Sequence, residues 1–186
     1  MFVGDATVGK SSIVKTFCSG PNGFSKTYVM TQGCEVLDKP WKFNNKPIEF
    51  QIIDTSGQGI FRDISSDMVS ASQISRSFVV VFVYDITNQD SFNSLQAWLK
   101  TVRDSLKDKL FYGYVVANKS DISERIVVRP QDGAAFARSN RFEFVETSAV
   151  TSIQLTVNDT ENLFKSIADG VVRRYEDRVR RVSSFN

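Results

Sequence analysis

The stretch Gly4-Asp5-Ala6-Thr7-Val8-Gly9-Lys10-Ser11 follows the pattern G-x-x-x-x-G-K-S, which joins a strand to a helix in phosphate-binding proteins. Its glycines allow a tight turn, so that successive N–H groups point at phosphate oxygens, and the following helix adds its positive N-terminal end. Lys10 can then reach the β- and γ-phosphates, and the Ser11 hydroxyl can ligate Mg²⁺. Apolar residues before and after the stretch fit the required strand and helix. We therefore predict a nucleotide phosphate site in an α/β fold.

The composition limits the class of protein. The chain has 186 residues, 41% of them hydrophobic and 24% charged, which suits one globular domain over residues 1–186. A net charge of +2 gives no reason to expect nucleic acid as a partner. Histidine is absent and cysteine occurs twice, which excludes a Cys/His zinc site, a histidine base and a disulfide framework.

The two ends of the chain support further expectations. Only three residues precede Gly4, whereas a strand usually has about five or six, so we expect a truncated first strand. No cysteine stands at the C-terminus and no glycine follows Met1, so we expect no lipid anchor. Without a membrane-length apolar run or a signal-peptide pattern, a soluble cytoplasmic protein is expected.

Hydrophobic patterning predicts strands that alternate with helices. Strands are expected at 34–43, 47–54, 78–83, 112–117 and 142–145. Helices are expected after Lys10, from a cap at Thr87 to Leu106, at 132–139, and from a cap at Thr156 to about Val182. This order predicts a three-layer α/β fold with a mostly parallel sheet and one antiparallel edge strand, formed by the 34–54 hairpin.

Polar motifs follow three of the strands at their carboxyl ends, where ligands bind in open α/β sheets. These motifs are Asp54-Thr55-Ser56-Gly57-Gln58, Asn118-Lys119-Ser120-Asp121 and Glu146-Thr147-Ser148-Ala149. A carboxylate at Asp54 can hold Mg²⁺ through water. A single N-K-x-D is weak evidence, but these motifs and the phosphate loop together indicate a nucleotide site.

The motifs resemble those of the Ras superfamily of small GTPases, and within it the Rab branch. Local matches include Val83-Tyr84-Asp85-Ile86-Thr87 and Phe61-Arg62-Asp63-Ile64, and the resemblance covers nearly the whole chain. It implies the small-GTPase (P-loop NTPase) fold, GTP and GDP as ligands with Mg²⁺, and slow GTP hydrolysis.

The resemblance also implies how guanine is selected. Asp121 should accept two hydrogen bonds from the guanine N1 and N2 donors, a pair that adenine lacks on that edge. Asn118 should meet N7, the stem of Lys119 should lie across the base, and the Ala149 N–H should donate to O6. The alternative is a polar loop that only caps a helix.

A second set of implied residues surrounds the phosphates, the Mg²⁺ ion and the edge of the base. Thr31 matches the Mg²⁺-binding threonine that senses the γ-phosphate, and Gln58 matches the glutamine that orients the attacking water. Phe24 matches the aromatic residue edge-on to guanine, and Tyr28 the one that covers the phosphates. Taken singly, Phe24 could instead be a buried loop anchor and Gln58 a solvated side chain.

Three groups of site residues result. The expected catalytic residues are Gln58, Lys10 and Thr31, and the expected metal ligands are Ser11, Thr31 and Asp54. The expected nucleotide contacts are Asp5, Ala6, Thr7, Val8, Gly9, Lys10, Ser11, Ser12, Phe24, Tyr28, Thr31, Gly57, Asn118, Lys119, Asp121, Ser148 and Ala149.

The sequence also departs from the pattern of the branch. Ala6 stands where Ras has glycine, and its methyl group should crowd the γ-phosphate and slow hydrolysis. Gly59-Ile60 replace a Glu-Arg pair, and Met68-Val69 replace two tyrosines. We therefore do not expect ordinary Rab partners.

A narrower resemblance is to the Rab-like GTPase subunit of intraflagellar transport complex B. It is carried by the sequence segments 28–36, 115–121 and 174–179. It implies a place in the cilium or flagellum and a small β-sandwich subunit of that complex as partner. A GTPase-activating protein is a separate expected partner. A conventional vesicle-trafficking Rab and a non-cycling structural GTP-binding subunit remain the alternatives.

The last helix is expected to continue past the domain as an amphipathic segment. Tyr175, Val179 and Val182 extend its apolar stripe, and five arginines surround them, at positions 173, 174, 178, 180 and 181. This segment is either a solvated basic end or a partner-binding helix.

Overall fold

The computed structural model describes residues 1–20, 27, 29–58, 78–106, 110–150 and 159–183. Within that part of the chain, six strands form one sheet in the order β2-β3-β1-β4-β5-β6. The strands are β1 Phe2–Val3, β2 Cys34–Phe43, β3 Lys46–Thr55, β4 Val79–Asp85, β5 Tyr112–Asn118 and β6 Glu143–Thr147. The α-helices are α1 Lys10–Ser19, α3 Gln89–Asn93, α4 Leu95–Leu106, α5 Pro130–Ser139 and α6 Asp159–Ser183. Several predictions concern residues outside the described part of the chain. These are the contacts of Phe24 and Tyr28, the replaced pairs Gly59-Ile60 and Met68-Val69, and the cap at Thr156.

The predicted mostly parallel sheet with one antiparallel edge strand is confirmed. All neighbouring strands are parallel except β2 and β3, which pair from Cys34↔Thr55 to Phe43↔Lys46. The hairpin turns at Asn44 and Asn45, whose φ angles are 47° and 62°. Asparagine tolerates this left-handed region, which explains the tight connection.

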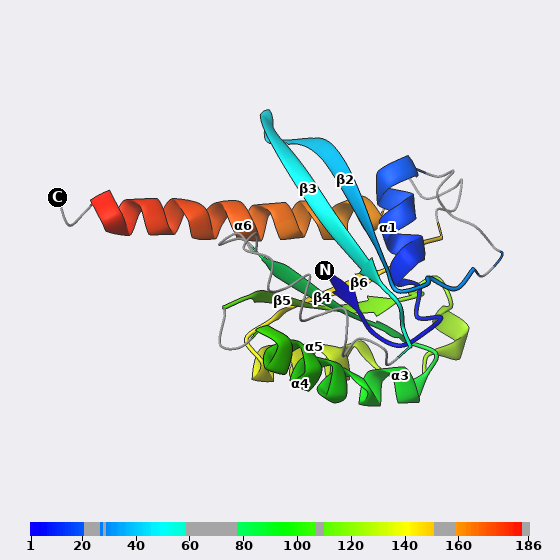
Figure 1. The fold of residues 1–186 in the computed structure, drawn as a ribbon. Helices are drawn as coiled ribbons and strands as arrows, with labels where there is room; N and C mark the ends of the chain where they lie inside the picture. Colours follow the sequence, from blue (N-terminus) through cyan, green and yellow to red (C-terminus); the bar gives the residue numbers. More distant parts are fainter. Residues whose placement is uncertain (21–26, 28, 59–77, 107–109, 151–158, 184–186) are drawn as a thin grey trace.

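Two apolar cores lie on opposite faces of the sheet. The helices α4 and α5 cover one face, and α1 and α6 cover the other (Figure 1). In β4, Phe82 and Tyr84 enter the first core, whereas Val81 and Val83 enter the second. The strand is thus buried on both faces, as its continuous apolar run predicts.

The helix expected to begin at a Thr87 cap differs in two respects. Its cap is Asn88, whose side-chain oxygen accepts hydrogen bonds from the N–H groups of Asp90 (2.9 Å) and Ser91 (3.2 Å). The Thr87 hydroxyl instead donates to Asp85 at 2.7 Å, so it is not the cap. The helix is also divided into α3 and α4 at Ser94.

The last helix agrees closely with expectation. It extends to Ser183, against a predicted end at about Val182, and its second half runs well past the sheet (Figure 1). None of the described helices is long and apolar enough to cross a membrane.

Candidate nucleotide-binding site

A cavity of about 400 Å³ lies at the carboxyl ends of the parallel strands. This is where the topology of an open α/β sheet places ligands, and the volume is in the range of small-molecule sites. Its walls come from the phosphate loop and the start of α1, from residues 27, 29–31 and 55–58, and from loops 118–122 and 148–150.

The phosphate loop is held by its own lysine. The Lys10 ammonium donates to the carbonyls of Gly4 and Asp5, both at 2.8 Å. Burial lowers the pKa of Lys10 to about 8, because it disfavours the charged form, while the Asp54 and Asp5 charges act against this shift. Gly9 has φ 96° and lies so close to the Asn118 amide that a Cβ would collide with it. Glycine is therefore required there.

A cluster of oxygens lies beside Lys10. The hydroxyls of Ser11 and Thr31 are 2.8 Å apart, which joins α1 to the 29–31 segment. Asp54 is completely buried, and neither carboxylate oxygen has a hydrogen-bond partner among the described residues. Burial raises the pKa of Asp54, and the nearby Ser11 hydroxyl and Lys10 ammonium oppose that rise.

These oxygens fit Mg²⁺, which prefers oxygen ligands and is usually held by one or two carboxylates together with nucleotide phosphates. An orphaned buried carboxylate is costly unless a cation or donor joins it. No group of three or more His, Cys, Asp or Glu that could hold a metal ion occurs in the described part of the chain. Two hydroxyls and one buried carboxylate suit an ion that shares its remaining ligands with a nucleotide.

The opposite end of the cavity is linked internally. Asp121 accepts a hydrogen bond of 2.5 Å from the Ser148 hydroxyl, which in turn accepts one of 3.0 Å from the Val150 N–H. The Asn118 amide donates to the Val8 carbonyl at 2.7 Å and so ties this loop to the phosphate loop. The Ser120 N–H donates to the Thr147 carbonyl at 3.2 Å. These contacts bring the two predicted base motifs together.

An ion pair that the sequence did not predict fixes Lys119. Its ammonium lies 2.5 Å from the Asp85 carboxylate at the end of β4, and its φ is 68°. Asp85 is 6% exposed and also accepts from the N–H and the hydroxyl of Thr87. The available signal was an aspartate at the carboxyl end of a buried strand, the same signal that identified Asp54.

Most of the predicted residues line the cavity. They are Ala6, Thr7, Gly9, Lys10, Ser11, Ser12, Thr31, Gly57, Gln58, Asn118, Lys119, Asp121, Ser148 and Ala149. Asp5, Val8 and Asp54 are absent from the lining, although each contacts or adjoins a residue in it. Gly57 packs against the Ala6 backbone so closely that a Cβ would overlap it.

Sequence reasoning missed several lining residues. Ile122 and Val150 adjoin the base motifs, and Lys15, Val29 and Met30 line the cavity from α1 and the 29–31 segment. The four apolar residues carried no signal beyond their places near predicted motifs, because an isolated apolar loop residue is common. Lys15 carried none beyond its place in the helix that follows the phosphate loop.

Comparison with known protein families matches residues 1–172 to the model of the Ras family. The matched region includes the described parts of the cavity wall, and it ends within α6, before Tyr175 and Val179.

Proposed function

Because this chain belongs to the Ras family of small GTP-binding proteins, we propose that it cycles between GTP and GDP in the cavity described above, with slow Mg²⁺-dependent hydrolysis. One observation carries this proposal. At one end of the cavity, the hydroxyls of Ser11 and Thr31 lie near the buried Lys10. At the other end lies Asp121, which already accepts a hydrogen bond from the Ser148 hydroxyl. That arrangement suits a ligand with phosphates at one end and a hydrogen-bonding base at the other.

The roles at the phosphate end follow from chemistry. The Lys10 ammonium would exchange the Gly4 and Asp5 carbonyls for phosphate oxygens, a stronger charge-assisted contact. The hydroxyls of Ser11 and Thr31, with Asp54 through water, would hold Mg²⁺, which neutralises charge developing on the phosphates. Gln58 lines the same cavity and would orient the attacking water.

Switching would use Thr31 and Gly57, which both face the cavity. In the GTP state the γ-phosphate and its ion hold the two segments, and hydrolysis releases them. The tight contact between Gly57 and Ala6 supports this role, because any group that separates their backbones also moves the 55–58 segment.

The test is the nucleotide that the purified protein carries. We expect guanine nucleotide at one equivalent, and turnover of added GTP at roughly 10⁻⁴ to 10⁻³ per second without an activating protein. Bound GTP that persists without turnover would favour the non-cycling structural subunit. Adenine nucleotide, or none, would overturn the proposed site.

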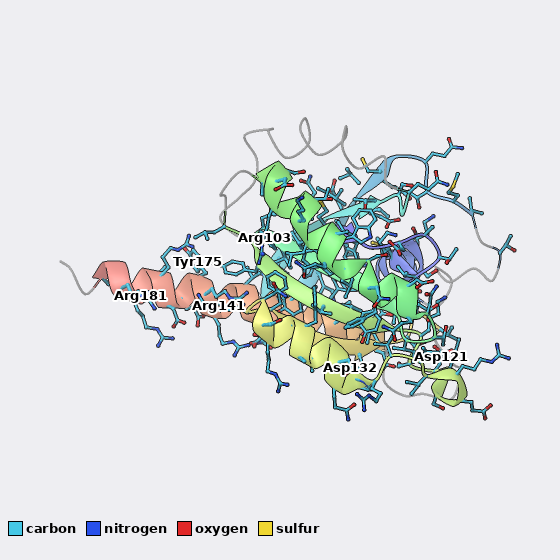
Figure 2. All side chains as sticks on the ribbon, turned by 90° about the horizontal axis from the view of Figure 1, so that it is seen from below. Arg103, Asp121, Asp132, Arg141, Tyr175 and Arg181 are labelled. Carbon is cyan, nitrogen blue, oxygen red and sulfur yellow. The ribbon has the colours of Figure 1, made fainter. Side chains whose placement is uncertain are left out.

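The second half of α6 supports a finer proposal, that the protein works in a complex with another protein. Tyr175 is 65% exposed and Val179 is 45% exposed, one helical turn apart. Figure 2 shows Tyr175 and Arg181 on the part of α6 that leaves the body, far from Asp121. Arg178 lies three positions after Tyr175 and so beside it on the helix surface. Arg173 and Arg180 pair with Asp169 and Glu176, and Arg174 packs over the Tyr112 ring at 3.9 Å.

Such a face fits a partner that offers an apolar groove with acidic residues at its rim. The resemblance within 174–179 points to the small β-sandwich subunit of intraflagellar transport complex B, and so to the cilium or flagellum. A conventional vesicle-trafficking role is the alternative, in which α6 would contribute little to partner binding.

Substitutions that introduce negative charge into the apolar pair test this proposal. Tyr175→Glu with Val179→Glu should abolish co-purification of the co-expressed β-sandwich subunit and leave GDP binding intact. The matched control is Leu110→Glu, at a 95% exposed apolar residue outside α6, which should retain the partner. Retention of the partner by the α6 variant would overturn the assignment of this face.

A further inference from the structure

A hydrogen bond connects α4 to the phosphate loop. The Trp98 indole N–H donates to the Asp5 carboxylate at 2.7 Å, across 93 positions of sequence. Trp98 is only 8% exposed and belongs to the core between α4 and the sheet. An indole with a single N–H donor in a packed core points in one direction, so its partner is fixed as well.

Asp5 presents an electrostatic problem to the loop that contains it. The loop is built to receive anions, yet Asp5 places a negative charge within it. Its backbone carbonyl lies 2.8 Å from the Lys10 ammonium, so its side chain is anchored within reach of the cation that phosphate requires. A carboxylate free to rotate could therefore pair with Lys10 and repel phosphate.

We propose that Trp98 is a positioning residue for nucleotide binding, which holds the Asp5 carboxylate toward α4 and out of the cavity that the phosphates would enter. The absence of Asp5 from the cavity lining, although Ala6 and Lys10 are present in it, agrees with this role. The inference rests on the proposed nucleotide site, and it adds a residue of α4 that does not line the cavity.

The proposal predicts an effect that depends on the charge of Asp5. Trp98→Phe keeps an aromatic ring in the core but removes the donor. It should accelerate GDP release by about tenfold to a hundredfold, the size expected for a hydrogen bond to a charged group. In an Asp5→Asn background, where no carboxylate needs to be held, the same substitution should change release by no more than about threefold.

The experiment measures release of a fluorescent GDP analogue from four Mg²⁺-loaded proteins: wild type, each single variant and the double variant. Trp41→Phe is the matched control, because Trp41 is the other tryptophan and packs on Phe17 and Phe50 away from the cavity. It should leave release unchanged. A merely structural Trp98 would give the same acceleration in both Asp5 backgrounds, and that result would overturn the proposal.

A further variant covers the case in which Trp98→Phe unfolds below the assay temperature. Asp5→Glu keeps the charge and leaves Trp98 in place, but displaces the carboxylate by one methylene. Faster release from Asp5→Glu than from Asp5→Asn supports the proposal, and equal or slower release overturns it. Wild-type protein that binds no GDP would overturn the nucleotide site and this inference together, whereas normal binding without coupling would overturn the inference alone.

Discussion

The two ends of the cavity are built on different principles. At the base end, Asp121, Ser148, Asn118 and Lys119 are held by contacts with other protein groups. At the phosphate end, Lys10 occupies two loop carbonyls and Asp54 is buried without a hydrogen-bond partner among the described residues. The base end is therefore assembled in advance, whereas the phosphate end has groups whose best partners come with the ligand.

This difference separates recognition from switching. Because the side chains of the base end are already held in place, little conformational entropy is lost when a base binds. The site can also reject a base that offers Asp121 no hydrogen-bond donors. At the phosphate end, the proposed ligand would replace internal contacts with contacts to phosphate or Mg²⁺, so the geometry there would follow the state of the ligand. We expect substitutions at the base end to change nucleotide specificity. Substitutions at the phosphate end should change hydrolysis or the proton uptake that accompanies binding.

The largest effect is expected at the base end. Asp121→Asn should weaken GDP binding by about 10²- to 10⁴-fold, because the acceptor loses its charge and one of its two oxygens is replaced by an NH₂ donor that faces a guanine donor. It should improve xanthosine diphosphate binding, since xanthine has a carbonyl where guanine has its amino group. Titration of both nucleotides with both proteins measures the exchange, and equal weakening for the two bases would contradict a base-reading Asp121.

Gln58→Leu should affect catalysis alone. Losing one neutral hydrogen bond to the attacking water corresponds to a drop in single-turnover hydrolysis of about tenfold. GTP affinity should stay intact, because Gln58 lies at the phosphate end and does not read the base. An unchanged hydrolysis rate would remove Gln58 from the mechanism.

Ser148→Ala tests whether the base end is pre-assembled. Without the Ser148 hydroxyl, Asp121 loses its internal donor, and we expect GDP affinity to fall by about fivefold. Thr101→Ala serves as control, since it removes an exposed α4 hydroxyl that bonds to the Ala97 carbonyl. Equal affinities for the two variants would show that Asp121 needs no such support.

The smallest effect concerns a proton at the phosphate end. With the pKa of Lys10 lowered to about 8, roughly half of the free protein carries a neutral lysine at pH 8. Phosphate favours the ammonium, so GDP binding at pH 8 should take up about half a proton, and affinity should fall as pH rises through 8. Calorimetry with Mg²⁺ chelated, in buffers of different ionisation enthalpy, measures the uptake, which should vanish near pH 6.5. Uptake independent of pH would contradict a Lys10 with a lowered pKa.

The sequence predicted what local spacing determines. The loop from Gly4 to Ser11 and the motif from Asn118 to Asp121 are short patterns whose backbone geometry depends on neighbouring residues, so their place at strand ends was predictable. The hydrogen bond between Trp98 and Asp5 and the ion pair between Lys119 and Asp85 were not. Such contacts depend on how α4 and β4 pack against loops distant in sequence. The hydrophobic periodicity of a helix or strand does not indicate which distant loop it will contact.

The prediction of Thr87 as the helix cap was wrong for a related reason. Thr87 and Asn88 are both good caps by residue type, and the choice between them depends on Asp85, which accepts the Thr87 hydroxyl and leaves Asn88 for the helix. The assignments of Phe24 and Tyr28 remain predictions, because both residues lie outside the described part of the chain.

A base end that is assembled before binding should select guanine. Displacement of labelled GDP from wild-type protein by GTP or ATP tests it most directly, because the two competitors share their phosphates and Mg²⁺ and differ only in the base. We predict that GTP displaces GDP at comparable concentration, and that ATP is weaker by about 10⁴-fold, as expected where a site built to hydrogen-bond its ligand is left unpaired. Displacement by ATP at concentrations similar to those of GTP would contradict guanine selection by the base end.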